Sequence, residues 1–186
     1  MYPKVRAGRT QSPSLPLRQA RPYRRRSIFR ITIGRERQIL TPSADSVVGN
    51  WRNELGNPSL AASIDEAGAG AGAPPSDADY IQSPIGPVNE GCRVKLLGGS
   101  DPASSILHEI HWRGGKDQAG PPAINLTLQL RQGGGDVLGA GTLIASFSRN
   151  DVADGFTDFF EELSAGQADS ITNYSDLYLE AYANQV

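Results

Sequence analysis

Cysteine is almost absent from this chain, whose 186 residues include only Cys92. A single cysteine excludes an internal disulfide framework and any metal site built on several thiolates. Because Cys92 lies in an alternating apolar run, we expect a buried thiol rather than a reactive one. The sequence also lacks an apolar run near the roughly 18 residues of a membrane span, and it has no apolar signal-peptide stretch. We therefore expect a soluble chain with no membrane partner.

Glycine and proline, in contrast, are abundant, with 21 Gly and 13 Pro residues. Inside a helix each costs about 1 or 3 kcal/mol relative to alanine, so this composition favours short strands joined by turns. The chain length suits one domain with an appendage.

The two kinds of charge are strongly separated along the chain. Residues 1–40 hold eleven Lys and Arg against one Glu, a net charge of +10, whereas residues 41–186 hold seven against nineteen Asp and Glu, a net charge of −12. Such asymmetry is typical of a basic arm that contacts a polyanion or an acidic protein surface. We therefore divide the chain into an extended, Pro-rich anchoring arm (1–40) and an acidic domain (41–186).

The arm itself changes character near its end. Residues 1–27 have four prolines and no hydrophobic periodicity, so we expect them to be extended, or ordered only when docked. Ser27–Ile33 alternates and is rich in β-branched residues, which predicts a strand. That strand could pair with a sheet edge of its own domain or of another chain, and the sequence leaves both alternatives open.

The predicted partner-binding residues combine arginines with aromatic and apolar neighbours. Guanidinium groups bind carboxylates and phosphates, and aromatic rings contact bases or protein. We favour docking onto protein, since the domain is itself acidic, and keep nucleic acid as the alternative. The residues are Arg18, Arg21, Tyr23, Arg24, Arg25, Arg26, Ile28, Phe29, Arg30 and Ile31.

The acidic domain shows strand patterns without alternating helices, which predicts an all-β fold: a two-sheet antiparallel, jelly-roll-like β-sandwich. The clearest pattern is Ile124–Arg131, in which apolar and polar residues alternate strictly. One short helical turn is expected at Ser164–Asp169, with Ser164 as its N-cap. The other predicted strands are Leu60–Ile64, Cys92–Leu97, Ile106–Trp112, Leu138–Phe147, Phe156–Leu163 and Leu177–Ala183.

Two clusters invite a metal-site hypothesis. His108 and His111 are three residues apart, and on a strand that spacing points the rings to opposite faces, so we expect structural histidines. Four carboxylates flank a Gly/Ala-rich loop without the spacing of a calcium loop. We interpret them as a solvated acidic turn and retain a loop-ordering cation as a weaker alternative. These carboxylates are Asp65, Glu66, Asp77 and Asp79.

Sequence motifs for catalysis are not found. Gly133-Gly134-Gly135 opens no helix and lacks the Gly-Lys-Ser/Thr step of a phosphate loop, and no nucleophile elbow occurs. We predict neither enzymatic activity nor a cofactor.

Several segments of the acidic domain nevertheless form a recognisable set. They are the stretch that ends at Trp51, Leu60–Glu66 (LAASIDE), Asp77–Ser83 (DADYIQS), Leu126–Gly133 (LTLQLRQG) and Leu163–Leu179 (LSAGQADSITNYSDLYL). This set resembles a β-sandwich module of tailed-bacteriophage virion proteins. The resemblance covers about residues 41–186 and leaves the basic arm outside it.

The resemblance implies a structural role in the virion, assembled in the host cytoplasm. We expect a capsid cement or decoration protein, multimeric on the particle, whose partners are the major capsid protein or other virion subunits. A collar, nozzle, head-fibre or tail-associated protein is the alternative. A carbohydrate-binding module is a second alternative, with Trp112 or Tyr178 and Tyr182 as its aromatic platform. In the packing itself, we expect buried anchors at Trp51, Ile64, Ile171 and Tyr174.

Overall fold

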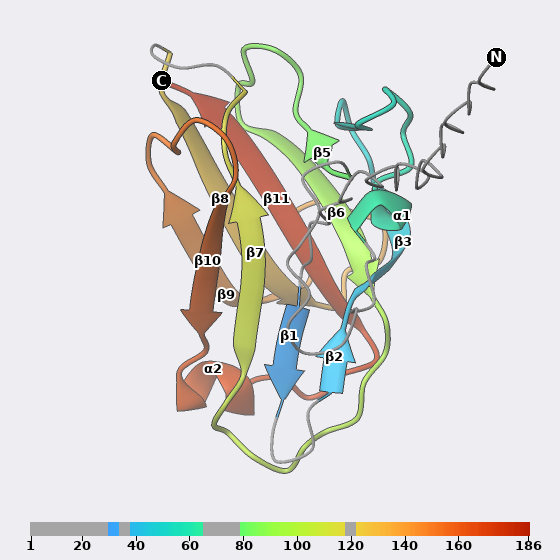
Figure 1. Cartoon of the computed structure of the whole chain (residues 1–186). Helices are drawn as coiled ribbons and strands as arrows, with labels where there is room; N and C mark the ends of the chain where they lie inside the picture. The colour runs from blue at the N-terminus through green and yellow to red at the C-terminus, as the bar shows by residue number, and fades with distance from the viewer. Residues whose placement is uncertain (1–29, 34–37, 65–78, 118–121) are drawn as a thin grey trace, which may run out of the picture.

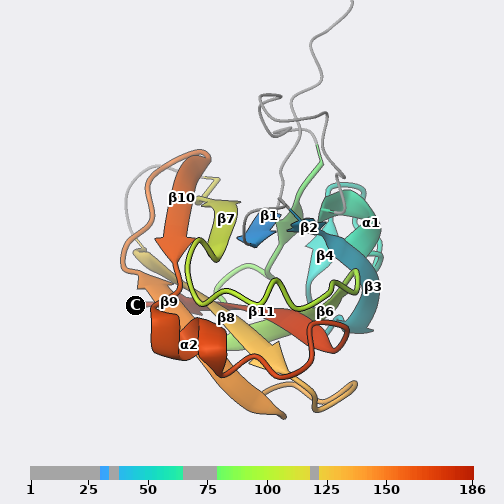
Figure 2. The same ribbon diagram turned by 90° about the horizontal axis from the view of Figure 1, so that it is seen from below.

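Two antiparallel sheets lie face to face in the computed structural model (Figure 1), which describes residues 30–33, 38–64, 79–117 and 122–186, the first range by its backbone. The four-stranded sheet has the order β10 (Thr157–Glu162), β7 (Glu109–Gly114), β1 (Arg30–Ile33), β2 (Gln38–Leu40). The five-stranded sheet has the order β3 (Pro42–Val47), β6 (Glu90–Leu96), β11 (Leu177–Gln185), β8 (Ile124–Gln132), β9 (Thr142–Arg149). Figure 2 shows the two layers from below. The predicted all-β sandwich is confirmed.

The alternation of apolar and polar residues along the sequence correctly predicts the central strands. In β8, Leu128 and Leu130 point into the core, and β11 pairs with β8 over nine residues, from Leu177 opposite Gln132 to Gln185 opposite Ile124. Apolar side chains on one face of each strand pack against the other sheet, as half-buried antiparallel strands require. The other predicted strands correspond to β6, β7, β9 and β10, with shifted ends. The largest shift is at β9, where residues 138–141 belong instead to a glycine-rich loop.

One predicted strand is wrong, because Leu60–Ile64 contains the short helix α1 (Ala61–Ile64). Its N-terminus is capped from a distance: Asp45 Oδ1 in β3 accepts hydrogen bonds from the backbone N–H groups of Leu60 (3.0 Å) and Ala61 (2.6 Å). The capping carboxylate satisfies amide donors that a helix start leaves without a partner. A short ribbon pairs β4 (Arg52–Asn53) with β5 (Ile81–Gln82), and β4 lies near this helix (Figure 2).

The predicted turn of helix at the C-terminal side is confirmed as α2 (Ala165–Asp169), with Ser164 as its N-cap. The Ser164 side chain accepts from the Gln167 N–H, and the Gln167 side chain accepts from the Ser164 N–H, which is a complete capping box. Within the described ranges, no helix is long and apolar enough to span a membrane.

The core lies between the two sheets and contains the predicted anchors. Trp51, Ile64, Ile171 and Tyr174 are each at most 6% exposed. Cys92 is buried as expected, and its burial raises the pKa of the thiol to about 12. The thiol is therefore protonated at neutral pH, and it serves as a small apolar side chain.

Candidate interaction surface

The basic segment is joined to the sandwich through β1. Arg30 and Ile31, two of the ten predicted partner-binding residues, lie opposite His111 and Ile110 of β7. The other eight, between Arg18 and Phe29, lie outside the described residues. β1 also pairs with β2 on its other side. Of the two alternatives for this strand, the structure contains pairing within the chain.

The strands β1 and β2 place the end of the expected arm inside the sandwich. β1 is an interior strand of the four-stranded sheet, and Leu40 at the end of β2 is only 2% exposed within the core. The chain then passes directly from β2 to β3, so it crosses from one sheet to the other around Thr41. The basic segment that precedes the described sandwich is therefore residues 1–29.

The two histidines face opposite sides of the four-stranded sheet, as predicted. His108 is fully buried, and its Nε2 lies 2.9 Å from the hydroxyl oxygen of Tyr174. His111 lies on the outer face, where its Nε2 is 2.9 Å from a carboxylate oxygen of Glu109. The rings cannot share a metal ion in this arrangement.

Burial lowers the pKa of His108 below its ordinary value of 6.5, because charging the ring inside the core costs solvation energy. Burial also raises the pKa of its partner Tyr174. The His108–Tyr174 pair is therefore neutral at physiological pH and closes one end of the core.

The depressed pKa of His108 predicts an acid-sensitive fold. Below pH 6.5 the unfolded chain binds a proton that the folded chain excludes, so the free energy of unfolding falls as the pH falls from 6.5 toward the folded-state pKa. The slope should approach about 1.4 kcal/mol per pH unit in that window. Urea unfolding at pH 5.0 and 7.5 should show the loss in the wild-type chain and a smaller loss in His108→Gln. Equal losses of unfolding free energy in the wild-type chain and in His108→Gln would contradict the assignment of this acid sensitivity to His108.

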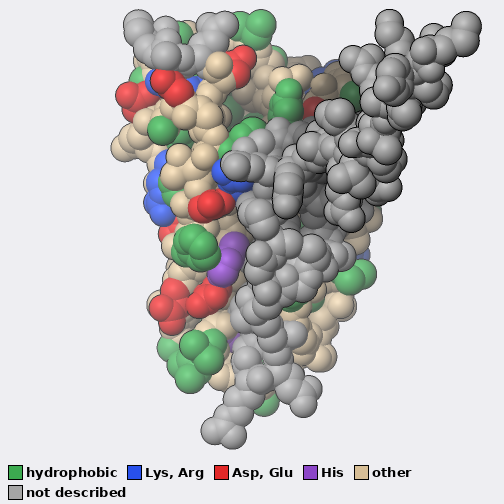
Figure 3. Space-filling model, in the orientation of Figure 1, with side chains coloured by type: hydrophobic (Ala, Val, Ile, Leu, Met, Phe, Trp, Pro, Cys, Tyr) green, Lys and Arg blue, Asp and Glu red, His purple; other side chains and the backbone are tan. Residues whose placement is uncertain are grey.

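The outer face of the four-stranded sheet carries an exposed aromatic ring among carboxylates. Phe160 of β10 is 69% exposed, and His111 contacts it edge-on with the ring centroids 4.5 Å apart. Beside them, Glu162 of β10 lies directly opposite Glu109 of β7. Figure 3 shows this face, with hydrophobic side chains and carboxylates near the purple histidine. Like charges directly across a strand pair repel each other, so this row of the sheet is electrostatically unfavourable.

The sequence contained a signal for this surface that our predictions did not use. In the predicted strand Phe156–Leu163, strict alternation places Phe160 on the same side as Asp158 and Glu162. The neighbouring Phe159 points the other way and stacks on Trp112 with centroids 4.4 Å apart. Two adjacent phenylalanines in one strand cannot both face the core.

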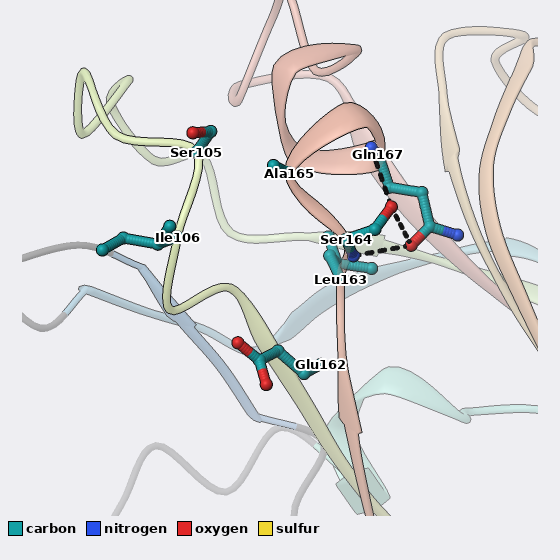
Figure 4. A pocket seen from close by; sticks show the side chains of 7 residues that line it. All are labelled: Ser105, Ile106, Glu162, Leu163, Ser164, Ala165 and Gln167. Atoms are coloured by element: carbon teal, nitrogen blue, oxygen red, sulfur yellow. Dashed lines mark hydrogen bonds between the residues drawn. The ribbon is translucent and has the colours of Figure 1, made fainter.

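A shallow hollow of about 310 Å³ continues from this face toward α2 (Figure 4). Glu162 forms part of its wall, together with the exposed Ile106 of the β6–β7 loop and the N-terminal turn of α2. The next residue, Leu107, is 48% exposed and adopts a positive φ of 63°. A branched residue in that region is strained, so the loop holds Ile106 and Leu107 outward at an energetic cost.

The candidate metal ligands are not brought together in what the structure describes. Asp65, Glu66 and Asp77 lie outside the described residues, and Asp79 is half-buried at the start of the segment that leads to β5. Among described residues, no group of three or more His, Cys, Asp or Glu side chains could hold a metal ion.

A buried ion pair on the outer side of the five-stranded sheet was missed by the sequence analysis. Arg93 of β6 and Glu180 of β11 are both fully buried, with Arg93 Nη1 2.6 Å from Glu180 Oε1. Glu180 forms a second ion pair with Arg131, whose Nε lies 2.8 Å from Glu180 Oε2, and it accepts hydrogen bonds from the Tyr182 hydroxyl (2.9 Å) and the Gly139 N–H (2.8 Å). The carboxylate is therefore held by two guanidinium groups and two neutral donors, which offset its desolvation.

The loop between β8 and β9 covers this ion pair. Arg93 donates to the carbonyls of Val137 and Ala140, each at 3.1 Å, and to the carbonyl of Gly133. Gly141 has a φ of +81°, and a Cβ there would lie 2.4 Å from the Gly133 oxygen, so the closed loop requires glycine. The glycine-rich loop that joins β8 to β9 therefore also covers a buried charge.

The aromatic platform expected for a glycan is wrong for two of its three residues. Trp112 and Tyr178 are buried, Trp112 in the core and Tyr178 beneath the Arg93 guanidinium, which lies 4.0 Å from its ring centroid. Tyr182 is partly exposed, but its hydroxyl is bonded to Glu180. Its burial and that bond raise the Tyr182 pKa to about 12. These rings therefore belong to packing and not to an open sugar-binding face.

Comparison with protein-family models, with curated proteins and with solved structures finds no match. Function is therefore argued from the residues and their arrangement.

Proposed function

We propose that this chain is a structural protein of a tailed-phage virion, and most specifically a capsid cement or decoration protein. The motif set of its acidic domain supports the virion role by resemblance. The separation of charge supports attachment through the basic segment, because a domain of net negative charge carries a strongly cationic extension. A collar, nozzle, head-fibre or tail-associated position is the alternative within the same structural role.

The observation that carries the anchoring proposal is the position of β1. The basic segment continues directly into a strand that is hydrogen-bonded to a neighbour on each side, β7 and β2. A segment that holds a domain on a particle transmits load to the fold at the residue where it enters. Entry through an interior strand distributes that load over two hydrogen-bonded strand pairs.

Attachment to particles that lack the chain tests this role. The full chain should attach, and a full-length variant with Arg24→Gln, Arg25→Gln and Arg26→Gln should attach at least about tenfold more weakly, since it loses three charge-assisted contacts. The matched control replaces Lys4, Arg6 and Arg9 with glutamine, which removes the same charge elsewhere in the segment.

Equal attachment of the Arg24–Arg26 variant and the wild-type chain would overturn anchoring through these arginines. Binding of the wild-type chain to duplex DNA, with affinity falling steeply as salt rises, would favour the nucleic-acid alternative.

A further inference from the structure

The outer face of the four-stranded sheet has an unpartnered edge. β10 pairs with β7 alone among the described strands, so alternate backbone N–H and C=O groups of its other edge point outward. Its six residues include Asp158, Glu161 and Glu162 and no Lys or Arg, and Glu161 is paired with Arg149 of β9. An acidic edge repels a second copy of itself and accepts a cationic strand.

The charges on this face are unevenly satisfied. Asp158 lies 2.8 Å from Arg113, so that pair is neutralised on the surface. Glu109 and Glu162 instead face each other across the strand pair, and the Nε2 of His111 lies 2.9 Å from a carboxylate oxygen of Glu109. A guanidinium between the two carboxylates would turn this repulsion into attraction.

We propose that this surface, defined by Glu109, His111, Phe160 and Glu162, is the receptor for the cationic segment Arg18–Arg26 of a second copy of this chain. The segment contains five arginines and no acidic residue. Arginine suits the surface, because its planar group binds carboxylates in a fork and also stacks on an exposed aromatic ring such as Phe160. This inference rests on the proposed function, in which the segment docks on a neighbouring subunit.

We assign the segment to a second copy because, in the proposed function, the segment docks on a neighbouring subunit. A segment that bound the surface of its own chain would leave the wild-type protein monomeric in the experiment below.

The hollow beside Glu162 extends the same surface. Its wall includes Ile106 and Ala165, so it offers an apolar contact next to the carboxylates. An apolar side chain of the docked segment, such as Leu17 next to Arg18, would fill it while the arginines bind Glu109 and Glu162.

A charge-swap experiment with full-length protein tests the proposal. Sedimentation velocity at low ionic strength should show self-association of the wild-type chain. Association should weaken at least about tenfold in the variant Glu109→Lys/Glu162→Lys, and likewise in Arg24→Glu/Arg25→Glu/Arg26→Glu. Mixing the two variants should restore association as a heterodimer, since each then offers a segment opposite in charge to the other's surface.

The matched control is Asp136→Lys/Asp154→Lys, two exposed loop carboxylates whose exchange changes the net charge equally and should leave association unchanged. Circular dichroism checks that each variant is folded. A wild-type chain that stays monomeric, or variants that do not recover association on mixing, would overturn the proposal. The experiment uses no particles, so a negative result would not contradict the proposed virion role. Absence of the chain from purified particles would likewise not contradict self-association measured here.

Discussion

Replacement of Arg93 by methionine is expected to lower the free energy of unfolding by about 3–5 kcal/mol. The substitution leaves Glu180 fully buried after the loss of its closest cation, at 2.6 Å. It also removes the donor that holds three carbonyls of the Gly133–Ala140 loop. Urea unfolding at neutral pH measures the change.

The double variant Arg93→Met/Glu180→Leu distinguishes the cost of an uncompensated buried charge from the cost of lost packing. With both charges removed, no carboxylate is left uncompensated, so the double variant should be more stable than Arg93→Met alone. The pair of Lys116 and Asp151, in which the Asp151 side chain is 62% exposed, supplies the control, and Asp151→Asn should cost no more than about 1 kcal/mol. If the double variant loses as much unfolding free energy as Arg93→Met and Glu180→Leu lose together, the two groups act independently, which would contradict this account of the ion pair.

A chain that begins at residue 41 is expected not to fold, whereas a chain that begins at residue 30 should fold like the full protein. The shorter chain loses β1 and β2, two of the four strands of one sheet, together with the buried Leu40. It also leaves β7 without its partner on that side. Such a loss exceeds what a marginally stable domain tolerates.

Thermal unfolding followed by circular dichroism distinguishes the two truncated chains. The chain of residues 30–186 should unfold cooperatively near the midpoint of the full protein, and the chain of residues 41–186 should show no cooperative transition. A cooperative transition of the shorter chain at the same midpoint would contradict the assignment of β1 and β2 to the sandwich.

The strands were predictable wherever a single strand carried its own pattern. In β8 the alternation of leucines with polar residues is complete, and the structure buries Leu128 and Leu130 as expected. The capping box of α2 was also local, since Ser164 and Gln167 are three residues apart.

Features set by distant contacts could not be predicted. LAASI is a short apolar run that fits a strand or a helix, and the carboxylate that caps the helix comes from Asp45, fifteen residues before Leu60. The strand β3 was missed because its sequence is polar and begins with a proline, and it forms by pairing with β6.

The candidate site likewise depends on contacts between residues that are far apart in the sequence. Arg93 and Glu180 are 87 residues apart, so only the pairing of β6 with β11 makes them neighbours. Glu109 and Glu162 are likewise brought together by the register of β7 and β10. The charge asymmetry of the chain was visible in composition, whereas the surface proposed to receive the basic segment requires the sheet register.

The copy number of this chain in purified particles tests the proposed virion role most directly. Quantitative gel analysis should detect the chain at on the order of hundreds of copies per particle if it covers the capsid lattice, and at about a dozen or fewer if it forms a collar or fibre. Absence of the chain from purified particles would contradict a structural role in the virion.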